Sequence, residues 1–137
     1  MKVAVCVEQY DKVGILPSQL ESLALLNTAM GVTDAAFIDG TIDGVKRTHG
    51  FTRYGSYEDF FASESGNVIV FTPVGGMDIR SVAPTNDSWL VFGPAMGWGN
   101  ALDNVIVVTR ATIPGGELNS RDAVPIALWE LSKWQVQ

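Results

Sequence analysis

Three glycine-rich segments, each placed after a short apolar run, carry the chemistry that this sequence offers. They are Pro73-Val74-Gly75-Gly76 after Asn67–Thr72, Gly93-Pro94-Ala95-Met96-Gly97 after Trp89–Phe92, and Ile113-Pro114-Gly115-Gly116 after Asn104–Thr109. Ligands of open parallel sheets bind beyond the carboxyl ends of strands, and glycine there lets backbone groups approach a ligand closely. Three such loops at one edge predict a pocket lined by backbone, which suits an adenine edge and a ribose. Taken singly, each loop is also explained as an ordinary turn.

Other kinds of site are excluded or weakly supported. One histidine, His49, and one cysteine, Cys6, cannot build a Cys/His zinc cluster or an internal disulfide, so we expect no metal site. The sequence has no GxxxxGK[S/T] loop, and no GxGxxG follows the first apolar run, so nucleotide triphosphates and dinucleotides are weak candidates. A triad of Ser56, His49 and Asp59 rests on nearness in sequence, which is poor evidence for a triad. Cys6 is expected to be an inert thiol of the core.

Composition predicts one domain covering residues 1–137. The chain is 47% hydrophobic and 18% charged, which excludes general disorder. A net charge of −6 excludes a strongly basic nucleic-acid binder but permits a local basic patch. Lys46, Arg47, His49 and Arg53 form the basic cluster of the sequence, for which phosphate contact and a solvated surface are both open. No apolar run is long enough to span a membrane, so we expect a cytoplasmic protein with no membrane partner.

Short apolar runs alternate with helical stretches along the chain. Leu, Ala, Glu and Gln dominate the first helical stretch, which Gly31 ends. Ser120 is the expected N-cap of the last helix, and Pro125 is expected in its first turn. This alternation predicts an α/β domain with a largely parallel sheet and helices on both faces. The predicted strands are Lys2–Val7, Ala35–Ile38, Phe51–Tyr54, Asn67–Thr72, Trp89–Phe92 and Asn104–Thr109, and the predicted helices are Gln19–Met30, Ser56–Phe61 and Ser120–Trp134.

Four stretches of the chain together carry a family resemblance. Pro17 and Gly31-Val32 bracket the first helix, and Val70–Gly75 is a strand that ends in glycine. Leu90-Val91-Phe92-Gly93-Pro94 is a strand followed by Phe-Gly-Pro. Ile113-Pro114 is followed by Leu118-Asn119 and, four residues after the asparagine, by Ala123. In this order and spacing they resemble the motifs of the SPOUT superfamily, specifically the SpoU/TrmH-type RNA ribose 2′-O-methyltransferases, over essentially the whole chain.

The resemblance implies a fold, a cofactor and partners. It implies a trefoil-knotted C-terminal half, a homodimer whose interface lies beside the site, and an RNA substrate, for which we expect tRNA. It also implies S-adenosylmethionine held by the three loops, with Asn119 as the catalytic residue that organises the site. Arg47 and Arg53 are the candidate RNA-binding residues. The implied cofactor-binding residues are Thr72, Pro73, Val74, Gly75, Phe92, Gly93, Pro94, Gly97, Ile113, Gly115, Leu118, Asn119 and Ala123.

The departures from the family pattern fall on its polar chemistry. They are Gln19, Glu21, Leu25, Ala95 and Glu117, where the family has Asn, Gly, Arg, Glu and Ser. Because a leucine offers no charge or hydrogen bond to a ribose hydroxyl, two functions stay open. One is an active S-adenosylmethionine-dependent RNA ribose 2′-O-methyltransferase. The other is a SPOUT-fold binding protein that holds the cofactor or RNA without methyl transfer. Trp98 lies between Gly97 and Gly99, and we expect it to pack in an interface rather than to stack on a ligand.

Overall fold

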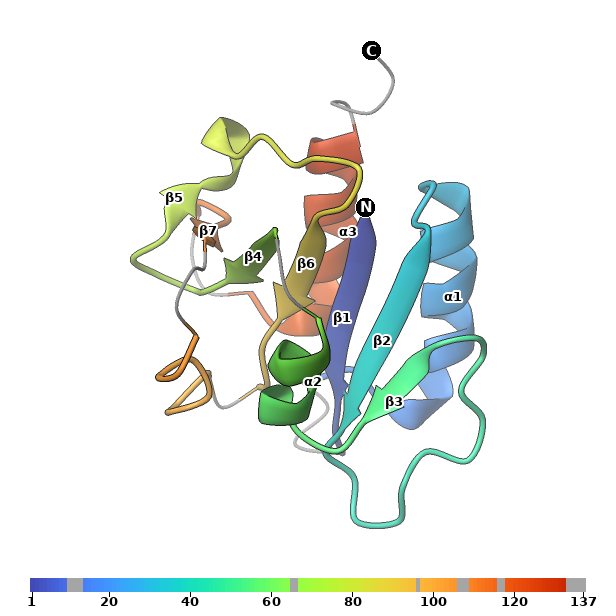
Figure 1. Cartoon of the computed structure of the whole chain (residues 1–137). Coiled ribbons are helices and arrows are strands. Elements are labelled where there is room, and N and C mark those ends of the chain that lie inside the picture. Colours follow the sequence, from blue (N-terminus) through green and yellow to red (C-terminus); the bar gives the residue numbers. More distant parts are fainter. Residues whose placement is uncertain (10–13, 65–66, 96, 106–108, 116–117, 133–137) are drawn as a thin grey trace.

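A parallel β-sheet forms the centre of the computed structural model, which describes residues 1–9, 14–64, 67–95, 97–105, 109–115 and 118–132 (Figure 1). Seven strands within these ranges lie in the order β3-β2-β1-β6-β4-β7-β5, and each neighbouring pair is parallel. The chain first builds one side of β1 and then returns to build the other. The strands are β1 Lys2–Val7, β2 Asp34–Asp39, β3 Thr52–Tyr54, β4 Val68–Phe71, β5 Met77–Asp78, β6 Trp89–Phe92 and β7 Thr109–Thr112.

Helices cover both faces of this sheet (Figure 1). Successive residues of β1 point to opposite faces, so its apolar run serves two layers. On one face, Val5 belongs to a buried cluster with Leu20 of α1 and Leu128 of α3. On the other face, Ala4 belongs to a second cluster with Phe60 of α2. The predicted α/β architecture with helices on both faces is confirmed. The helices are α1 Leu20–Ala29, α2 Tyr57–Ser63 and α3 Ser120–Ser132, and two 3-10 turns cover Pro17–Gln19 and Ile79–Ser81.

Local sequence explains where the first two helices begin and end. Ser56 Oγ accepts a hydrogen bond from the backbone N–H of Asp59 at 3.1 Å, so Ser56 is the predicted N-cap of α2. The acidic residues in that first turn interact favourably with the positive end of the helix dipole and so stabilise the helix. α1 ends before Gly31, whose φ of +75° is a left-handed conformation that glycine adopts without strain.

The last strand ends three residues later than predicted. The prediction was Asn104–Thr109, but the structure places β7 at Thr109–Thr112, and residues 101–104 form turns. Residues 106–108, the middle of the predicted strand, lie outside the described residues. Within Thr109–Thr112 one side chain, Ala111, is fully buried, and β7 pairs with β4 on one side and β5 on the other.

The N-cap of α3 also differs from the prediction. α3 begins at the predicted residue, Ser120, but its N-cap is Asn119 and not Ser120, because the carbonyl of Asn119 accepts hydrogen bonds from the backbone N–H groups of Asp122 and Ala123. Pro125 therefore lies inside the helix beyond its first turn, where it contributes no N–H to the helical hydrogen bonds. Ser120 does not cap the helix, because its hydroxyl donates a hydrogen bond to the carbonyl of Gly93 in the loop after β6. The predicted end of this helix at Trp134 lies outside the described residues.

The trefoil knot that the resemblance implies stays a prediction, because residues 106–108 and 116–117, on either side of β7, lie outside the described residues. In the described part of the chain, no helix is long and apolar enough to cross a bilayer. Within the same ranges, no group of three His, Cys, Asp or Glu side chains is placed to hold a metal ion.

Candidate functional site

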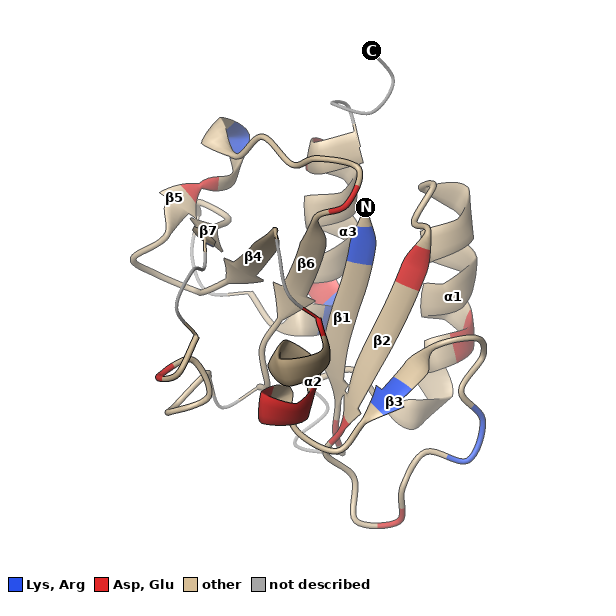
Figure 2. Cartoon of the chain, viewed as in Figure 1, with Lys and Arg blue, Asp and Glu red and all other residues tan. Residues whose placement is uncertain are grey.

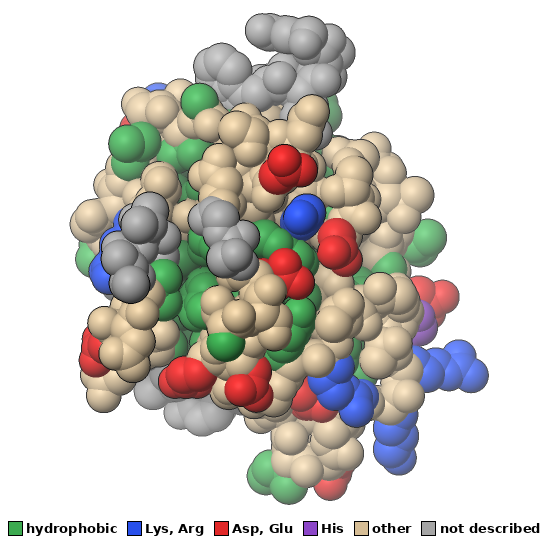
Figure 3. Space-filling model, in the orientation of Figure 1, with side chains coloured by type: hydrophobic (Ala, Val, Ile, Leu, Met, Phe, Trp, Pro, Cys, Tyr) green, Lys and Arg blue, Asp and Glu red, His purple; other side chains and the backbone are tan. Residues whose placement is uncertain are grey.

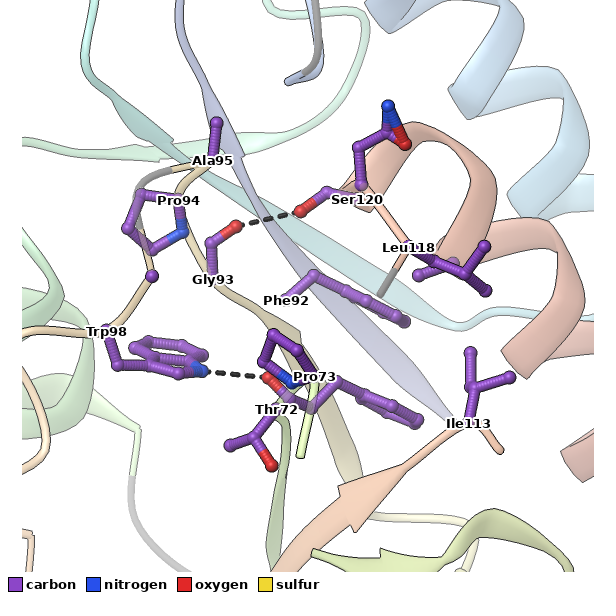
Figure 4. A pocket seen from close by; sticks show the side chains of 14 residues that line it. Thr72, Pro73, Phe92, Gly93, Pro94, Ala95, Trp98, Ile113, Leu118 and Ser120 are labelled. Atoms are coloured by element: carbon purple, nitrogen blue, oxygen red, sulfur yellow. Dashed lines mark hydrogen bonds between the residues drawn. The ribbon is translucent and has the colours of Figure 1, made fainter. Parts of the chain in front are cut away.

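A pocket lies where the carboxyl ends of β4 and β6 meet the loop after β7 and the start of α3 (Figure 4). Parallel neighbouring strands bring their carboxyl ends to one edge of the sheet. Each of the three glycine-rich loops contributes to this pocket, for example through Pro73 after β4, Pro94 after β6 and Ile113 after β7. The described residues that line it are Phe71, Thr72, Pro73, Phe92, Gly93, Pro94, Ala95, Gly97, Trp98, Ile113, Leu118, Asn119, Ser120 and Ala123.

Two stacked phenylalanine rings form the apolar wall of the pocket. Phe71 and Phe92 are the last residues of β4 and β6 and lie opposite each other in the parallel register. Their ring centroids are 4.6 Å apart and their planes differ by 5°. Both side chains are buried. An apolar wall with a few polar groups at its rim is typical of a small-molecule site.

The first turn of α3 is tied to the loop after β6. Ser120 Oγ donates a hydrogen bond to the carbonyl of Gly93 at 2.8 Å (Figure 4). The carbonyl of Asn119 accepts from the backbone N–H of Asp122 at 3.0 Å and of Ala123 at 2.9 Å. Asn119, the predicted catalytic residue, therefore lines the pocket from a helix N-terminus, where the partial positive charge of the helix dipole is concentrated.

Trp98 lies inside the same pocket. Its indole Nε1 donates a hydrogen bond to the carbonyl of Phe71 at 2.8 Å (Figure 4). The indole approaches Gly93 so closely that a Cβ on this glycine would lie 2.8 Å from Cε2 of Trp98. Tyr57 meets the indole edge-on, with ring centroids 4.7 Å apart, and its hydroxyl donates to the carbonyl of Phe92 at 2.6 Å. Beside these two aromatic side chains, the cavity has a volume of about 90 Å³.

A carboxylate from the end of β1 holds the loop that carries Trp98. The carboxylate of Glu8 accepts a hydrogen bond from the backbone N–H of Ala95. Close approach of Gly14 makes room for this side chain, because a Cβ on Gly14 would lie 2.9 Å from Cγ of Glu8. The family pattern has a glutamate where this chain has Ala95. Here an acidic group reaches the loop from a distant position in the sequence.

Burial keeps the thiol and the phenol next to this loop neutral. Burial, and after it the nearby charge of Glu8, raise the pKa of Cys6 to about 12. Burial also raises the pKa of Tyr57 well above its ordinary value. Cys6 is free and buried in β1, which confirms it as a core thiol. Tyr57 keeps its proton and acts as a hydrogen-bond donor.

The structure brings most of the predicted cofactor-binding residues together in the pocket, but three of them lie outside its lining. Val74, Gly75 and Gly115 are exposed, and the Val74 side chain projects into solvent at 73% exposure. Gly75 and Gly115 have φ angles of +82° and +110°. Glycine at these two positions therefore makes a turn rather than room for a ligand. Cofactor binding by the lining residues stays a prediction.

The predicted RNA-binding residues lie far from the pocket. Arg53 is on the edge strand β3, and the three strands β2, β1 and β6 separate β3 from β4. Four strand spacings correspond to about 19 Å. Arg47 is exposed on the loop between β2 and β3. Figure 2 shows the basic residues of this region beside β3 and α1, and Figure 3 shows Lys, Arg and His side chains that project from the same side.

Asp39 fixes the start of the basic loop. Its carboxylate accepts hydrogen bonds from Thr41 Oγ1 at 2.7 Å and from the backbone N–H of Val45 at 2.8 Å, and it lies 3.7 Å from Nε of Arg53. Burial opposes the charged form of Asp39, but these hydrogen bonds and the charge of Arg53 outweigh it and hold the pKa below its ordinary value. Arg53 also lies over the ring of Phe37, 5.5 Å from its centroid. Arg53 is therefore partly engaged within its own chain.

Sequence analysis did not assign the roles of Glu8, Tyr57 and Ser120 at this site. Ser120 follows Asn119 directly in the stretch that resembles the family motif, so the sequence does contain a signal that Ser120 belongs to the site. Glu8 and Tyr57 act on loops far away in sequence, so no local pattern reveals them. Trp98 lines the pocket of its own chain, and its expected packing in an interface stays a prediction.

Comparison with known proteins gives structural matches alone. No protein-family model and no curated protein sequence matches the chain. The SpoU methyltransferase AviRb from Streptomyces viridochromogenes, in complex with AdoMet, has a TM-score of 0.73 at 15% identity. The match covers 100% of this chain and 58% of AviRb, so the chain spans little more than half the length of that protein.

Two further structures belong to proteins described by their action on tRNA. A protein from a structural study of the 2-OH methylation of C/U34 on tRNA has a TM-score of 0.72 at 14% identity, with 98% of this chain and 97% of that chain covered. The TrmH/SpoU tRNA modifying enzyme of A. aeolicus has a TM-score of 0.70 at 15% identity, with 98% and 75% covered. The SPOUT-type resemblance seen in the sequence is thus confirmed at the level of the fold.

Proposed function

We propose that this chain is an S-adenosylmethionine-dependent RNA methyltransferase that acts on a ribose 2′-hydroxyl, with tRNA as its substrate class. The observation that carries the proposal is the meeting of three glycine-rich loops in one pocket at the edge of the parallel sheet. The fold of SpoU-type proteins, one of them in complex with AdoMet, supports the cofactor. Two similar structures of tRNA-modifying proteins support the substrate class.

The residue types in the pocket fit S-adenosylmethionine. Phe71, Phe92 and Ile113 offer apolar surface to an adenine ring, and Asn119 and Ser120 offer polar groups to a ribose. None of the described lining residues is charged. The cavity volume of about 90 Å³ is smaller than the roughly 300 Å³ or more that drug-sized ligands occupy. Binding of the cofactor therefore requires a lining side chain to move.

The residues of this chain have two tasks in the proposed reaction. When bound, S-adenosylmethionine would supply an electrophilic methyl group and would leave as S-adenosylhomocysteine, and the proton of the substrate hydroxyl would pass to solvent because none of the described lining residues is a base. The amide of Asn119 has no acid–base capacity near neutral pH, so it orients a substrate hydroxyl by hydrogen bonding rather than removing its proton. The apolar wall of Phe71 and Phe92 keeps water from the reacting atoms.

The position of the basic cluster supports an extended nucleic acid as substrate. Arg53 on β3 lies three strand spacings, about 14 Å, from β6 and four spacings, about 19 Å, from β4, the two strands that end at the pocket. A substrate that touches both places is therefore longer than a mononucleotide. Because the contacts would be to phosphates, we expect Arg47→Ala to weaken binding of all RNA sequences alike and to reduce the dependence of affinity on salt.

We infer a homodimer through a groove beside the pocket. Trp129 and Ile126 on α3 are 68% and 44% exposed, which is unusual for large apolar side chains on one helix. Ile113 lines both this groove and the pocket, so a second copy seated here would form part of the site's surroundings. The described residues of the groove are Ile79, Arg80, Ile113, Pro114, Pro125, Ile126, Trp129 and Glu130. Sedimentation should give a dimer for the wild type and a monomer for Trp129→Glu, whereas Ile42→Glu at a fully exposed position should stay dimeric.

Two measurements test the proposed activity. Titration calorimetry with S-adenosylmethionine should show binding. Radiolabelled methyl groups from the cofactor should appear in bulk tRNA, and this label should resist treatment that removes groups attached to the bases. Asn119→Ala should lose roughly 100-fold in methylation rate when measured at saturating cofactor, the scale for one transition-state hydrogen bond. Absence of binding heat at millimolar cofactor refutes the proposal.

A second candidate is a binding protein without methyl transfer. Leu25, at the position of the family's arginine, is exposed on α1 and is not among the described residues of the pocket lining. Ala95 stands where the family pattern has a glutamate. Cofactor binding with no methyl transfer to any RNA pool, even with the dimer intact, would favour this candidate over the enzyme.

A further inference from the structure

The indole of Trp98 is a flat aromatic ring in the lining of the pocket. It lies against the backbone of Gly93, where a side chain of any other residue would collide with it. Its N–H group is paired with the carbonyl of Phe71, and its edge meets the ring of Tyr57. The space that the indole fills, called the slot below, is therefore bounded by the backbone of Gly93 and has the carbonyl of Phe71 as an acceptor at its edge; Figure 4 shows the indole and this hydrogen bond.

We propose that Trp98 is the residue that selects ligands for this pocket: its indole occupies the slot in the unliganded chain, and a planar heteroaromatic ring with an N–H donor at its edge binds by displacing it. This inference rests on the proposed function, for which the displacing ring is adenine. The exocyclic amine of adenine offers the same kind of donor that the indole N–H gives to the Phe71 carbonyl. A ligand without such a donor leaves that carbonyl unpaired, which disfavours its binding.

The neighbours of Trp98 allow its side chain to leave without unfolding of the sheet. Gly97 and Gly99 flank it with φ angles of +87° and +52°, and neither has a side chain to obstruct rotation of the indole. Trp98 is itself only partly buried, so one side of the indole already faces the exterior. By contrast, Tyr57, whose ring meets the indole edge-on, is buried and stays in place beneath it.

Displacement also explains the small size of the cavity. The remaining space of about 90 Å³ is what the pocket keeps while the indole is in place. A ligand that needs the slot binds with an affinity reduced by the fraction of molecules in which the slot is free. Removal of the indole should therefore raise the affinity for adenine-containing ligands, which is the opposite of what removal of a contact residue does.

The experiment compares Trp98→Ala, Trp98→Phe and the wild-type chain by calorimetry with S-adenosylhomocysteine and with adenosine. We expect Trp98→Ala to bind both probes about tenfold more tightly and Trp98→Phe, which keeps a ring but loses the N–H, to lie in between. Ile42→Ala, at a fully exposed position, is the matched control and should bind as the wild type does. Thermal unfolding of each variant checks that the chain is folded.

A second readout follows the indole directly in the unaltered sequence. With 5-fluorotryptophan incorporated, the ¹⁹F signal missing from Trp98→Phe identifies Trp98, and this signal should shift when S-adenosylhomocysteine saturates the protein. If the wild type binds but Trp98→Ala binds equally or more weakly, or the Trp98 signal does not move, the displacement proposal is overturned while the proposed function stands. If neither the wild type nor Trp98→Ala binds either probe, the proposed function falls and the displacement proposal falls with it.

Discussion

Replacement of Tyr57 by phenylalanine tests whether the hydrogen bond beneath the pocket holds the ends of the strands in place. The hydroxyl of Tyr57 donates to the carbonyl of Phe92 at 2.6 Å, and both residues are buried. Tyr57→Phe keeps the ring and its contact with Trp98 but leaves a buried carbonyl without its donor. The cost of such a change is about 1–2 kcal/mol in the free energy of unfolding. For 137 residues the entropy of unfolding is about 0.3 kcal/mol/K, so Tm should fall by about 3–7 °C.

Tyr54→Phe is the matched control for this measurement. Its hydroxyl donates to Glu64 at 3.2 Å and is only partly buried, so water replaces the lost partner and the cost should stay below about 0.5 kcal/mol. Urea unfolding followed by circular dichroism gives both free energies under one set of conditions. Equal losses in the two variants, or no loss in Tyr57→Phe, would show that the Phe92 carbonyl finds another donor and that the reasoning about this pocket is wrong.

Three further outcomes are expected. The pKa of Asp39 in the folded state is below its ordinary value, so the stabilisation by its carboxylate is complete above about pH 4 and is lost as the pH falls through the folded pKa. The unfolding free energies of the wild type and Asp39→Asn should therefore differ by about 1–2 kcal/mol at pH 7 and converge in acid. A constant difference across this range would contradict it. Burial and a pKa of about 12 predict that Cys6 reacts with Ellman's reagent at pH 8 only after denaturant is added; fast reaction of the native chain would count against the buried placement. Ser120→Ala removes the 2.8 Å bond to the Gly93 carbonyl and should lower the unfolding free energy by about 0.5–1.5 kcal/mol, measured by urea titration; an unchanged midpoint would refute this role.

The parts of the fold that the sequence predicted best are the strands buried on both faces. Lys2–Val7 and Trp89–Phe92 form β1 and β6 with the predicted bounds, because an unbroken apolar run between polar residues has one stable placement in a two-layered core. The helix at Ser56 was equally accessible, since its cap and first-turn carboxylates are local features. Element types along the chain therefore follow from short-range chemistry.

The elements and contacts that the sequence did not predict depend on partners far away in the chain. β7, with the sequence Thr-Arg-Ala-Thr, is a strand because β4 and β5 lie on either side of it. The bond from Glu8 to the backbone of Ala95 joins residues that no local pattern connects. For the same reason the pocket loops were found but the indole that fills the pocket was not, since its position depends on the backbone of Gly93 and Phe71.

The pairing of β1 with β6 has a consequence for synthesis of the protein. Lys2 lies opposite Trp89, so β1 leaves the ribosome well before β6, which is one of its two neighbours in the sheet. Until β6 follows, the nascent polypeptide exposes the open edge of an apolar strand, a surface prone to pairing with other chains. Such a molecule should depend on chaperones while it is being made and should misassemble when its translation is stalled before residue 89.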